Sequence, residues 1–264
     1  MLAETIRWVS HKVPNIRYIR SIPHRILKPM HKALRLQGGL VDVLGFKMHL
    51  DPNECVDSHL WFTPRNYDCQ ELDFLMRRFP DHGVFLDAGS NIGYWSLRFA
   101  HRFPNCRIYA VEANPATFEI LSQNINVNGY KNIQAINVGI SDEEGELPLF
   151  CNDTGNRGGD SFSLAASDRK VSVTVPVKPL SMILQQAQIA GIDILKLDIE
   201  GFESRVLKKF FDESDRSLWP KYICTEFSHA PEVIELITSK GYERVLTSRE
   251  NCILALIDAK LTAR

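Results

Sequence analysis

Acidic residues and glycines mark the ends of two predicted strands in the first half of the chain. One apolar run ends at Asp87 and is followed by Gly89, Asn91 and Gly93, and a second run ends at Glu112, 25 positions after Asp87. Glycine lacks a Cβ, so the chain can turn tightly here and approach a ligand. A carboxylate has two acceptor oxygens, which suits the two hydroxyls of a ribose. The spacing indicates a βαβ unit that holds a nucleoside-bearing cofactor.

The glycine pattern narrows the type of cofactor. A dinucleotide-binding loop normally reads G-x-G-x-x-G, which brings the backbone onto a pyrophosphate. Here the turn reads G-S-N-I-G and has no third glycine. S-adenosyl-L-methionine carries no phosphate, so the sequence favours this cofactor, with Asp87 accepting from its ammonium or ordering a water that does. A nicotinamide-dependent oxidoreductase is a less favoured alternative, and the same strand, turn and helix also occur in α/β proteins as structure alone.

A second set of acidic residues follows the predicted fourth and fifth strands. The chain reads K-L-D-I-E-G from Lys196, and Glu226 and His229 follow the next apolar run. Asp198, Glu226 and His229 are candidate general bases, and an imidazole pKa of about 6.5 suits proton removal at neutral pH. The three could also bind a divalent metal, although their spacing is no metal signature. Alternatively, Asp198 pairs with Lys196, Glu226 is a rim charge and His229 neighbours a helix N-cap.

Glu200 has two equally supported interpretations. It follows Asp198 closely and would contact the substrate, or it lies in the first turn of a helix, where an acid favours the helix dipole.

A polar, glycine-rich insertion at residues 142–177 interrupts the repeating pattern. Within it, we expect Leu147–Phe150 and Val171–Val177 to pair as strands. Because the insertion follows the third strand, it can reach the same edge of the sheet and act as a substrate lid. A surface loop is the alternative. Three polar side chains of the lid would contact a polyhydroxylated acceptor: Asn156, Arg157 and Asp160.

Strands alternate with helices from about residue 67 onward, which predicts an α/β fold with a doubly wound, mainly parallel sheet. The last two strands are joined by a short polar turn and suggest an antiparallel pair at the edge. The carboxyl ends of parallel strands meet at one rim, where ligands bind beside the first strand. Seven strands are expected, at residues 84–87, 107–111, 133–138, 194–197, 222–225, 243–246 and 252–257.

The first 66 residues form a basic N-terminal extension ahead of a cofactor-binding domain at residues 67–264. Residues 1–37 hold eight Lys and Arg residues against Glu4 alone, a net charge of +7. Such an arm could contact an anionic membrane surface, or it could be a solvated tail or a dimer-swapping arm. Residues 38–50 predict a short β-ribbon, with Gly38-Gly39 as its turn.

Composition excludes several classes of protein. Six widely spaced cysteines favour reduced thiols, and a signal peptide or membrane-spanning run is not apparent, so we expect a cytoplasmic protein. The net charge of −1 gives no indication of a polyanion, so a nucleic-acid partner is not expected. A homodimer is plausible, and the acceptor is expected to be a small molecule or a glycan.

Five stretches of the chain together resemble the FkbM-type methyltransferase family, between about residues 67 and 229. They read F-L-D-A-G-S-N-I-G-Y-W-S-L, V-E-A-N-P, N-V-G-I-S-D, I-L-K-L-D-I-E-G-F-E and T-E-F-S-H. Tyr67-Asp68 looks like the aromatic-acid pair of the family, where Glu is more usual than Asp68. Gly139 stands where alanine is common.

The resemblance implies a class I methyltransferase (Rossmann-like) fold and methyl transfer from S-adenosyl-L-methionine to a hydroxyl of a sugar, glycolipid or secondary metabolite. Asp198 would lie near the transferable methyl. A non-catalytic binding module with a membrane-associating arm is the alternative from another class of protein. By motif match, the methionine end of the cofactor would lie at Asp87, Gly89, Asn91 and Gly93, the ribose at Glu112 and Asn114, and the adenine at Val138 to Ser141, with Tyr67 nearby.

Overall fold

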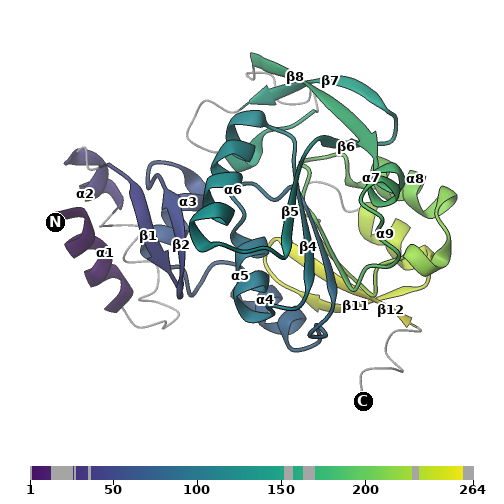
Figure 1. Cartoon of the computed structure of the whole chain (residues 1–264), viewed down its shortest axis with the longest axis horizontal. Helices are drawn as coiled ribbons and strands as arrows, with labels where there is room; N and C mark the ends of the chain where they lie inside the picture. Colours follow the sequence, from purple (N-terminus) through teal and green to yellow (C-terminus); the bar gives the residue numbers. More distant parts are fainter. Residues whose placement is uncertain are drawn as a thin grey trace.

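A seven-stranded sheet forms the centre of the computed structural model, which describes residues 2–12, 26, 28–34, 37–151, 157–162, 170–227 and 232–257 (Figure 1). The strand order is β11-β12-β10-β9-β3-β4-β5. The strands are β3 (Val84–Ala88), β4 (Arg107–Glu112), β5 (Ile133–Asn137), β9 (Ile194–Leu197), β10 (Tyr222–Glu226), β11 (Tyr242–Thr247) and β12 (Asn251–Leu256).

The predicted doubly wound sheet is confirmed. Neighbouring strands from β10 to β5 are parallel, whereas β12 is antiparallel to both β10 and β11. The last two strands are thus the expected antiparallel pair. β12 lies one position in from the edge, because it inserts between β10 and β11.

Helices cover both faces of the sheet because successive strand residues point to opposite sides. Phe85 of β3 packs in one buried cluster and the next residue, Leu86, packs in the other. On the first face lie α4 (Cys69–Met76), α5 (Tyr94–Arg102) and α6 (Pro115–Asn128). On the second face lie α7 (Leu180–Gln186), α8 (Glu203–Glu213) and α9 (Glu232–Ser239), and a short 3₁₀ helix, η3 (Arg216–Leu218), follows α8.

Local sequence signals begin and end α6. Asn114 accepts a hydrogen bond from the Ala116 N–H at its N-terminus, and Pro115 occupies the first turn. Gly129 ends the helix with φ +68°, a left-handed conformation that glycine adopts without strain. The sequence Asn128-Gly129 therefore ends α6.

The N-terminal part consists of α1 (Leu2–Lys12), α2 (Lys28–Ala33), β1 (Gly39–Val43), β2 (Phe46–Leu50) and α3 (Cys55–Phe62). The predicted ribbon exists as the hairpin β1–β2, but the turn predicted at Gly38-Gly39 is wrong. Gly39 already pairs with Leu50, and the chain turns at Leu44-Gly45, where φ is +57° and +99°. A two-residue hairpin turn with both φ angles positive matches the twist of its strands.

The hairpin packs on α6 through two asparagines. Asn124 accepts from the His49 N–H at 2.7 Å, and Asn128 accepts from the Lys47 N–H at 2.7 Å. Phe46 and Met48 of β2 lie in the same buried cluster as α4, α5 and α6. Residues 39–62 thus share a core with the sheet domain, and the domain division at residue 66 stays a prediction.

The insertion forms a small second sheet. β6 (Gly139–Ser141), β7 (Gly145–Cys151) and β8 (Lys170–Pro179) pair in the order β6-β8-β7, which confirms the predicted strand pair. A 3₁₀ helix, η2 (Arg157–Gly159), lies between β7 and β8 in the chain, and Phe150 forms a β-bridge with Ser161. This bridge holds residues 158–162 toward the rim of the main sheet. Within the described part of the chain, no helix has the length and apolar character needed to cross a bilayer.

Candidate active site

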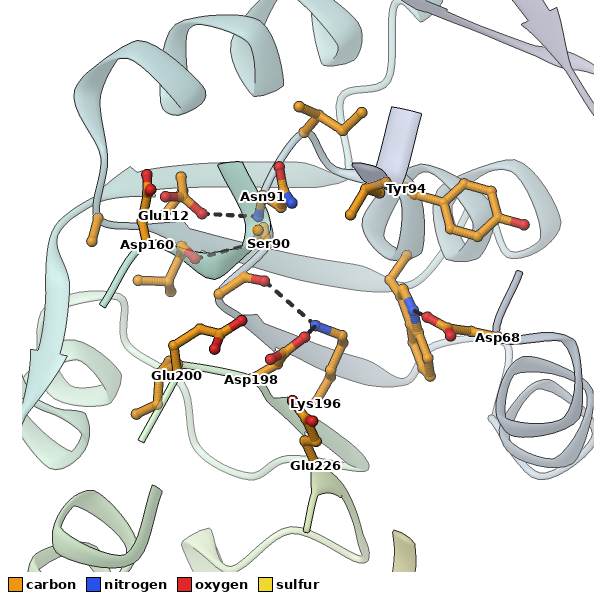
Figure 2. A pocket seen from close by; sticks show the side chains of 18 of the residues that line it. Asp68, Ser90, Asn91, Tyr94, Glu112, Asp160, Lys196, Asp198, Glu200 and Glu226 are labelled. Atoms are coloured by element: carbon orange, nitrogen blue, oxygen red, sulfur yellow. Dashed lines mark hydrogen bonds and ion pairs between the residues drawn. The ribbon is translucent and has the colours of Figure 1, made fainter. Parts of the chain in front are cut away.

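A cavity of about 290 Å³ lies at the carboxyl ends of the central strands (Figure 2). β3, β4, β9 and β10 all end at its wall, which is the rim that the sequence predicts. Because side chains alternate along each strand, Glu112 and Glu226 lie on the same side of the sheet. Ile108 and Ala110 of β4 pack on the α4–α6 face, so Glu112 projects to that side, and Tyr222 and Cys224 place Glu226 there likewise.

Glu112 is fixed by two backbone donors. Its Oε2 accepts from the Asn91 N–H at 2.8 Å and its Oε1 from the Asn114 N–H at 2.9 Å. Burial raises the pKa of Glu112 to about 7, against the lowering effect of these two N–H groups. The carboxylate lines the cavity with remaining acceptor capacity, as a ribose-binding group would.

The turn between β3 and α5 needs glycine where the sequence has it. Gly89 and Gly93 have φ of +79° and +90°, and Asn91 adopts +50°. A Cβ on Gly89 would overlap the carbonyl oxygen of Asp198, and one on Gly93 would overlap the side chain of Leu121. Gly89 and Asn91 line the cavity, whereas Gly93 lies behind it at the start of α5.

Asp87 lies beneath the cavity rather than on its wall. It is fully buried, and its Oδ2 accepts from the N–H and the hydroxyl of Ser96 in α5 at 3.2 and 2.6 Å. Its Oδ1 has no hydrogen-bond partner among the described residues. Burial raises the pKa of Asp87, and the ammonium of Lys196 opposes this. An interaction between Asp87 and a cofactor therefore needs a bridging water or a shift of this side chain.

Lys196 connects the two sequence motifs. Its Nζ lies 3.0 Å from Asp198 Oδ2 and donates to the carbonyl oxygen of Gly89 at 3.4 Å (Figure 2). Burial lowers the pKa of Lys196, but Asp198 and Asp87 outweigh it and raise the pKa above its ordinary value. The ammonium stays charged and orients Asp198, so the pairing of Lys196 with Asp198 that the sequence suggested is present.

Three carboxylates meet at the β9 and β10 end of the cavity (Figure 2). Asp198, Glu200 and Glu226 each place an oxygen within 4.8 Å of the other two. The sequence grouped Asp198 and Glu226 with His229, which lies outside the described residues. Glu200 joins the group instead because its backbone has φ +54°, which turns the chain back on itself after Asp198. Such a set can accept protons or hydroxyl hydrogen bonds.

The side chains of Tyr67 and Asp68 form another part of the wall. Asp68 Oδ2 accepts from the Trp95 Nε1–H at 2.8 Å, and burial raises the pKa of Asp68 to about 6, against this hydrogen bond. Burial also raises the pKa of Tyr67 well above its usual range, so the phenol stays neutral.

The β5 end of the cavity is apolar. Val138, Ile140, Leu149 and Phe162 line it beside Ala113, which gives a surface for a flat ring.

The predicted residues near this end differ in their placement. Asp160 lines the cavity and accepts from the Asn114 Nδ2 at 2.7 Å. Asn114 itself lies behind the wall, as does Ser141, whose hydroxyl lies 3.1 Å from Asp142. Asn156 lies outside the described residues, and only the backbone of Arg157 is described.

Two groups of cavity residues were not predicted from the sequence. Cys55, Val56 and His59 come from α3, Glu250 comes from the turn before β12, and Asn251 is the first residue of β12. α3 is buried at five of its eight positions, so it lacks the one-sided apolar pattern that identifies a helix. The second group reaches the site only because β12 lies next to β10.

Comparison with known proteins shows that the chain is similar to methyltransferases. The Methyltransferase FkbM domain matches residues 87–244. Methyltransferase sdnD of Sordaria araneosa is 30% identical over 213 residues, which cover 69% of this chain and 79% of that protein. Methyltransferase 1 of Beauveria bassiana is 30% identical over 152 residues, covering 51% and 61%. The chain belongs to the FkbM methyltransferase family, as its motifs indicated, and has the S-adenosylmethionine-dependent fold of that family.

Solved structures with a similar fold are more distant in sequence. A precorrin-6y C5,15-methyltransferase from Geobacter metallireducens is 14% identical with a TM-score of 0.45, covering 73% of this chain and 88% of that one. TrmK of M. capricolum, in complex with S-adenosyl-homocysteine, is 12% identical with a TM-score of 0.43, covering 70% and 66%.

Proposed function

We propose that the protein transfers a methyl group from S-adenosylmethionine to a hydroxyl oxygen of a sugar, a glycolipid or a glycosylated natural product. One observation carries this proposal. A single cavity joins Glu112, held by two backbone N–H groups, to the carboxylates of Asp198, Glu200 and Glu226. The first is suited to a ribose, and the second group is suited to a molecule with several hydroxyls.

The residues present fit the cofactor along the length of the cavity. Glu112 would accept from both ribose hydroxyls, and the apolar β5 end, with Val138 and Ile140, would receive the adenine. The methionine end would lie along the Gly89–Asn91 turn, which lines the cavity, and the absence of a Cβ on Gly89 lets this turn pack closely against Asp198. Asp87 and Asn114 would support this site from behind, through α5 and α6 respectively.

The reaction requires an acceptor oxygen, the methyl carbon and sulfur in line. When bound, the sulfonium supplies an electrophilic methyl with a good leaving group. Alignment of reactants is worth about 7–11 kcal/mol, and a positioned base adds roughly 10²–10⁴-fold. Asp198, oriented by Lys196, would accept the hydroxyl proton as the oxygen–methyl bond forms and the sulfur–methyl bond breaks. Glu200 and Glu226 would hold neighbouring hydroxyls of the acceptor.

A divalent cation offers an alternative way to activate the hydroxyl, through the same three carboxylates. Direct proton transfer to Asp198 does not need it. We therefore expect methyl transfer to persist after exhaustive chelation; loss of activity that Mg²⁺ restores would support the alternative.

Two measurements test the proposed function. Calorimetry should detect S-adenosylmethionine binding in the wild-type chain and its loss in Glu112→Ala. A screen of glycosylated acceptors with a labelled cofactor should find a methylated product in the wild type, and Asp198→Asn should retain cofactor binding while losing turnover. Absence of cofactor binding in the wild type would instead support a non-catalytic binding module.

A further inference from the structure

Exposed apolar side chains gather at the N-terminal end of the molecule. Of the described residues, seven large hydrophobic side chains are exposed, and six of these lie within the first 40 positions. Ile26, Met30 and Leu34, in and beside α2, recur every four residues, which is the spacing of one helix side. The other three are Trp8, Val9 and Leu40, on α1 and β1.

The opposite sides of α1 and α2 are anchored to the protein. Ile6 of α1 is buried, and Arg7 donates to the carbonyl oxygen of Asp42. His31 of α2 is buried edge-on against Trp61, with ring centroids 5.7 Å apart. Both helices are thus docked on one side while their other side keeps apolar surface in contact with water.

Positive charge is concentrated in this same segment. Residues 1–37 carry +7, whereas the whole chain carries −1. Lys32 is exposed in the same helix as Met30. Lys28 is half-buried, and its ammonium points to Ser58 of α3. A second copy of this chain would bring equal positive charge and be repelled. An anionic membrane surface complements both the charge and the apolar side chains.

We propose that the α1–α2 surface binds an anionic phospholipid membrane. We define this surface as Trp8, Val9, Ile26, Met30, Lys32 and Leu34. Helices of 11 and six residues would lie on the bilayer, since about 20 are needed to cross it. The tryptophan would sit at the level of the headgroups, where its amphipathic ring is favoured.

α3 connects this surface to the cavity. Trp61 and Phe62 of α3 face His31, and Ser58 accepts from Lys28 Nζ at 2.9 Å. The other side of α3 lines the cavity, with Val56 and His59. The bilayer would therefore lie about two helix layers, roughly 20 Å, from the cavity wall, because α2 and α3 both lie between them. Membrane binding itself does not depend on methyl transfer and can be measured without cofactor or acceptor.

Vesicle co-sedimentation of the full chain tests the apolar part of this surface. We expect binding to phosphatidylcholine vesicles with about 30% phosphatidylglycerol, and weak binding to phosphatidylcholine alone. The double variant Met30→Gln, Leu34→Gln should partition about tenfold less. Ile257→Gln is the control, because Ile257 is 46% exposed, between the 40% of Met30 and the 48% of Leu34, and is not part of the α1–α2 surface. Its partitioning should equal that of the wild type.

The charge component has its own pair of variants. Lys32→Gln should weaken binding about fivefold, whereas Lys131→Gln, exposed beside β5, should leave it unchanged. Equal partitioning of each variant and its control would overturn the proposal, as would equal binding to neutral vesicles. A dimer in light scattering that Met30→Gln, Leu34→Gln converts to a monomer would assign the surface to a second copy instead. If Met30→Gln, Leu34→Gln unfolds at a lower temperature than the wild type, the partitioning of Lys32→Gln tests the proposal instead.

Discussion

Glu112 is held in place by the protein before a ligand reaches it. Both of its oxygens accept a backbone N–H, one from Asn91 in the turn after β3 and one from Asn114 at the start of α6. Because the turn and the helix start are fixed by glycine and by an N-cap, the carboxylate cannot rotate away. Such preorganisation reduces the entropic cost of binding.

The ionisation of Glu112 should make cofactor affinity depend on pH. Its pKa is raised to about 7, so the carboxylate takes up a proton as the pH falls through neutrality. The protonated form has less acceptor capacity for two ribose hydroxyls. We expect the Kd of S-adenosylhomocysteine to rise by up to about tenfold per pH unit below about 7. Calorimetry at several pH values on either side of 7 measures this change in Kd. Glu112→Gln should bind weakly with no such dependence; a flat wild-type profile would contradict the assignment.

Gly89 provides a second test at the scale of one residue. Gly89→Ala adds a Cβ that overlaps the carbonyl oxygen of Asp198, in a backbone with φ +79°. Gly129→Ala is a matched control, since Gly129 has φ +68° but nothing within 4 Å of its added Cβ. Left-handed strain alone costs about 1–2 kcal/mol. Chemical denaturation should show a larger loss for Gly89→Ala, with loss of cofactor binding only there. Equal losses of stability in the two variants would mean that the structure adjusts to the Cβ added at position 89 without further cost.

At the scale of elements, Asn124 of α6 links three parts of the fold. It is fully buried, accepts from His49 of β2 at 2.7 Å, and donates to the carbonyl oxygen of Ile92 at 3.0 Å. The N-terminal hairpin and the turn after β3 are thus joined through one amide.

Asn124→Ala should destabilise the protein and weaken cofactor binding together. Removing the amide leaves a donor and an acceptor unsatisfied, which costs about 1–3 kcal/mol. Denaturant unfolding and calorimetry measure the two effects. Asn128→Ala is the comparison, because it removes a pair of bonds to Lys47 at the exposed edge and none to the turn. Asn128→Ala should lower the free energy of unfolding less than Asn124→Ala does, and it should leave cofactor affinity unchanged. A larger effect of Asn128→Ala on either quantity would refute the role of Asn124 as a link.

The elements of the sheet domain could be predicted from sequence because each has a local cause. Strand β9 occupies the predicted residues 194–197, since its apolar run is bounded by polar residues. The hairpin turn was misplaced because Gly38-Gly39 resembles a turn more closely than Leu44-Gly45 does. α3 was missed because polar Asp57 and Ser58 are buried among its apolar residues, which removes the helical pattern.

The site was predictable to the extent that it lies on strand ends. Glu112 and Asp198 follow directly from their strands, and the sheet places them on one rim. Glu250 depends on β12 inserting between β10 and β11, a long-range pairing with no local signal. Likewise, the sequence shows Asp87 at a strand end but not that α5 covers it.

For the whole molecule, buried carboxyls should make the cofactor-free protein less stable as pH rises. Burial raises the pKa of Asp68 to about 6 and of Glu112 to about 7, and raises that of Asp87. The unfolded chain releases these protons near pH 4, so between about 4 and 7 the folded state binds more protons and loses stability as pH rises. Thermal unfolding across this range checks the direction.

Asp68→Asn supplies the control for this trend. It keeps an acceptor for Trp95 Nε1–H at 2.8 Å but removes one titrating group, so its stability should fall less steeply between about pH 4 and 6. A slope identical to that of the wild type would show that Asp68 does not contribute.

The close approach of Gly89 to Asp198 has a thermodynamic consequence. The two motif loops touch backbone to backbone, and the Asp198 N–H also donates to the carbonyl oxygen of Ala88 at 3.0 Å. A ligand that restricts the motion of one loop therefore restricts the motion of the other. Occupancy of the cofactor half should raise affinity for the acceptor, and by reciprocity the acceptor should raise cofactor affinity by the same factor.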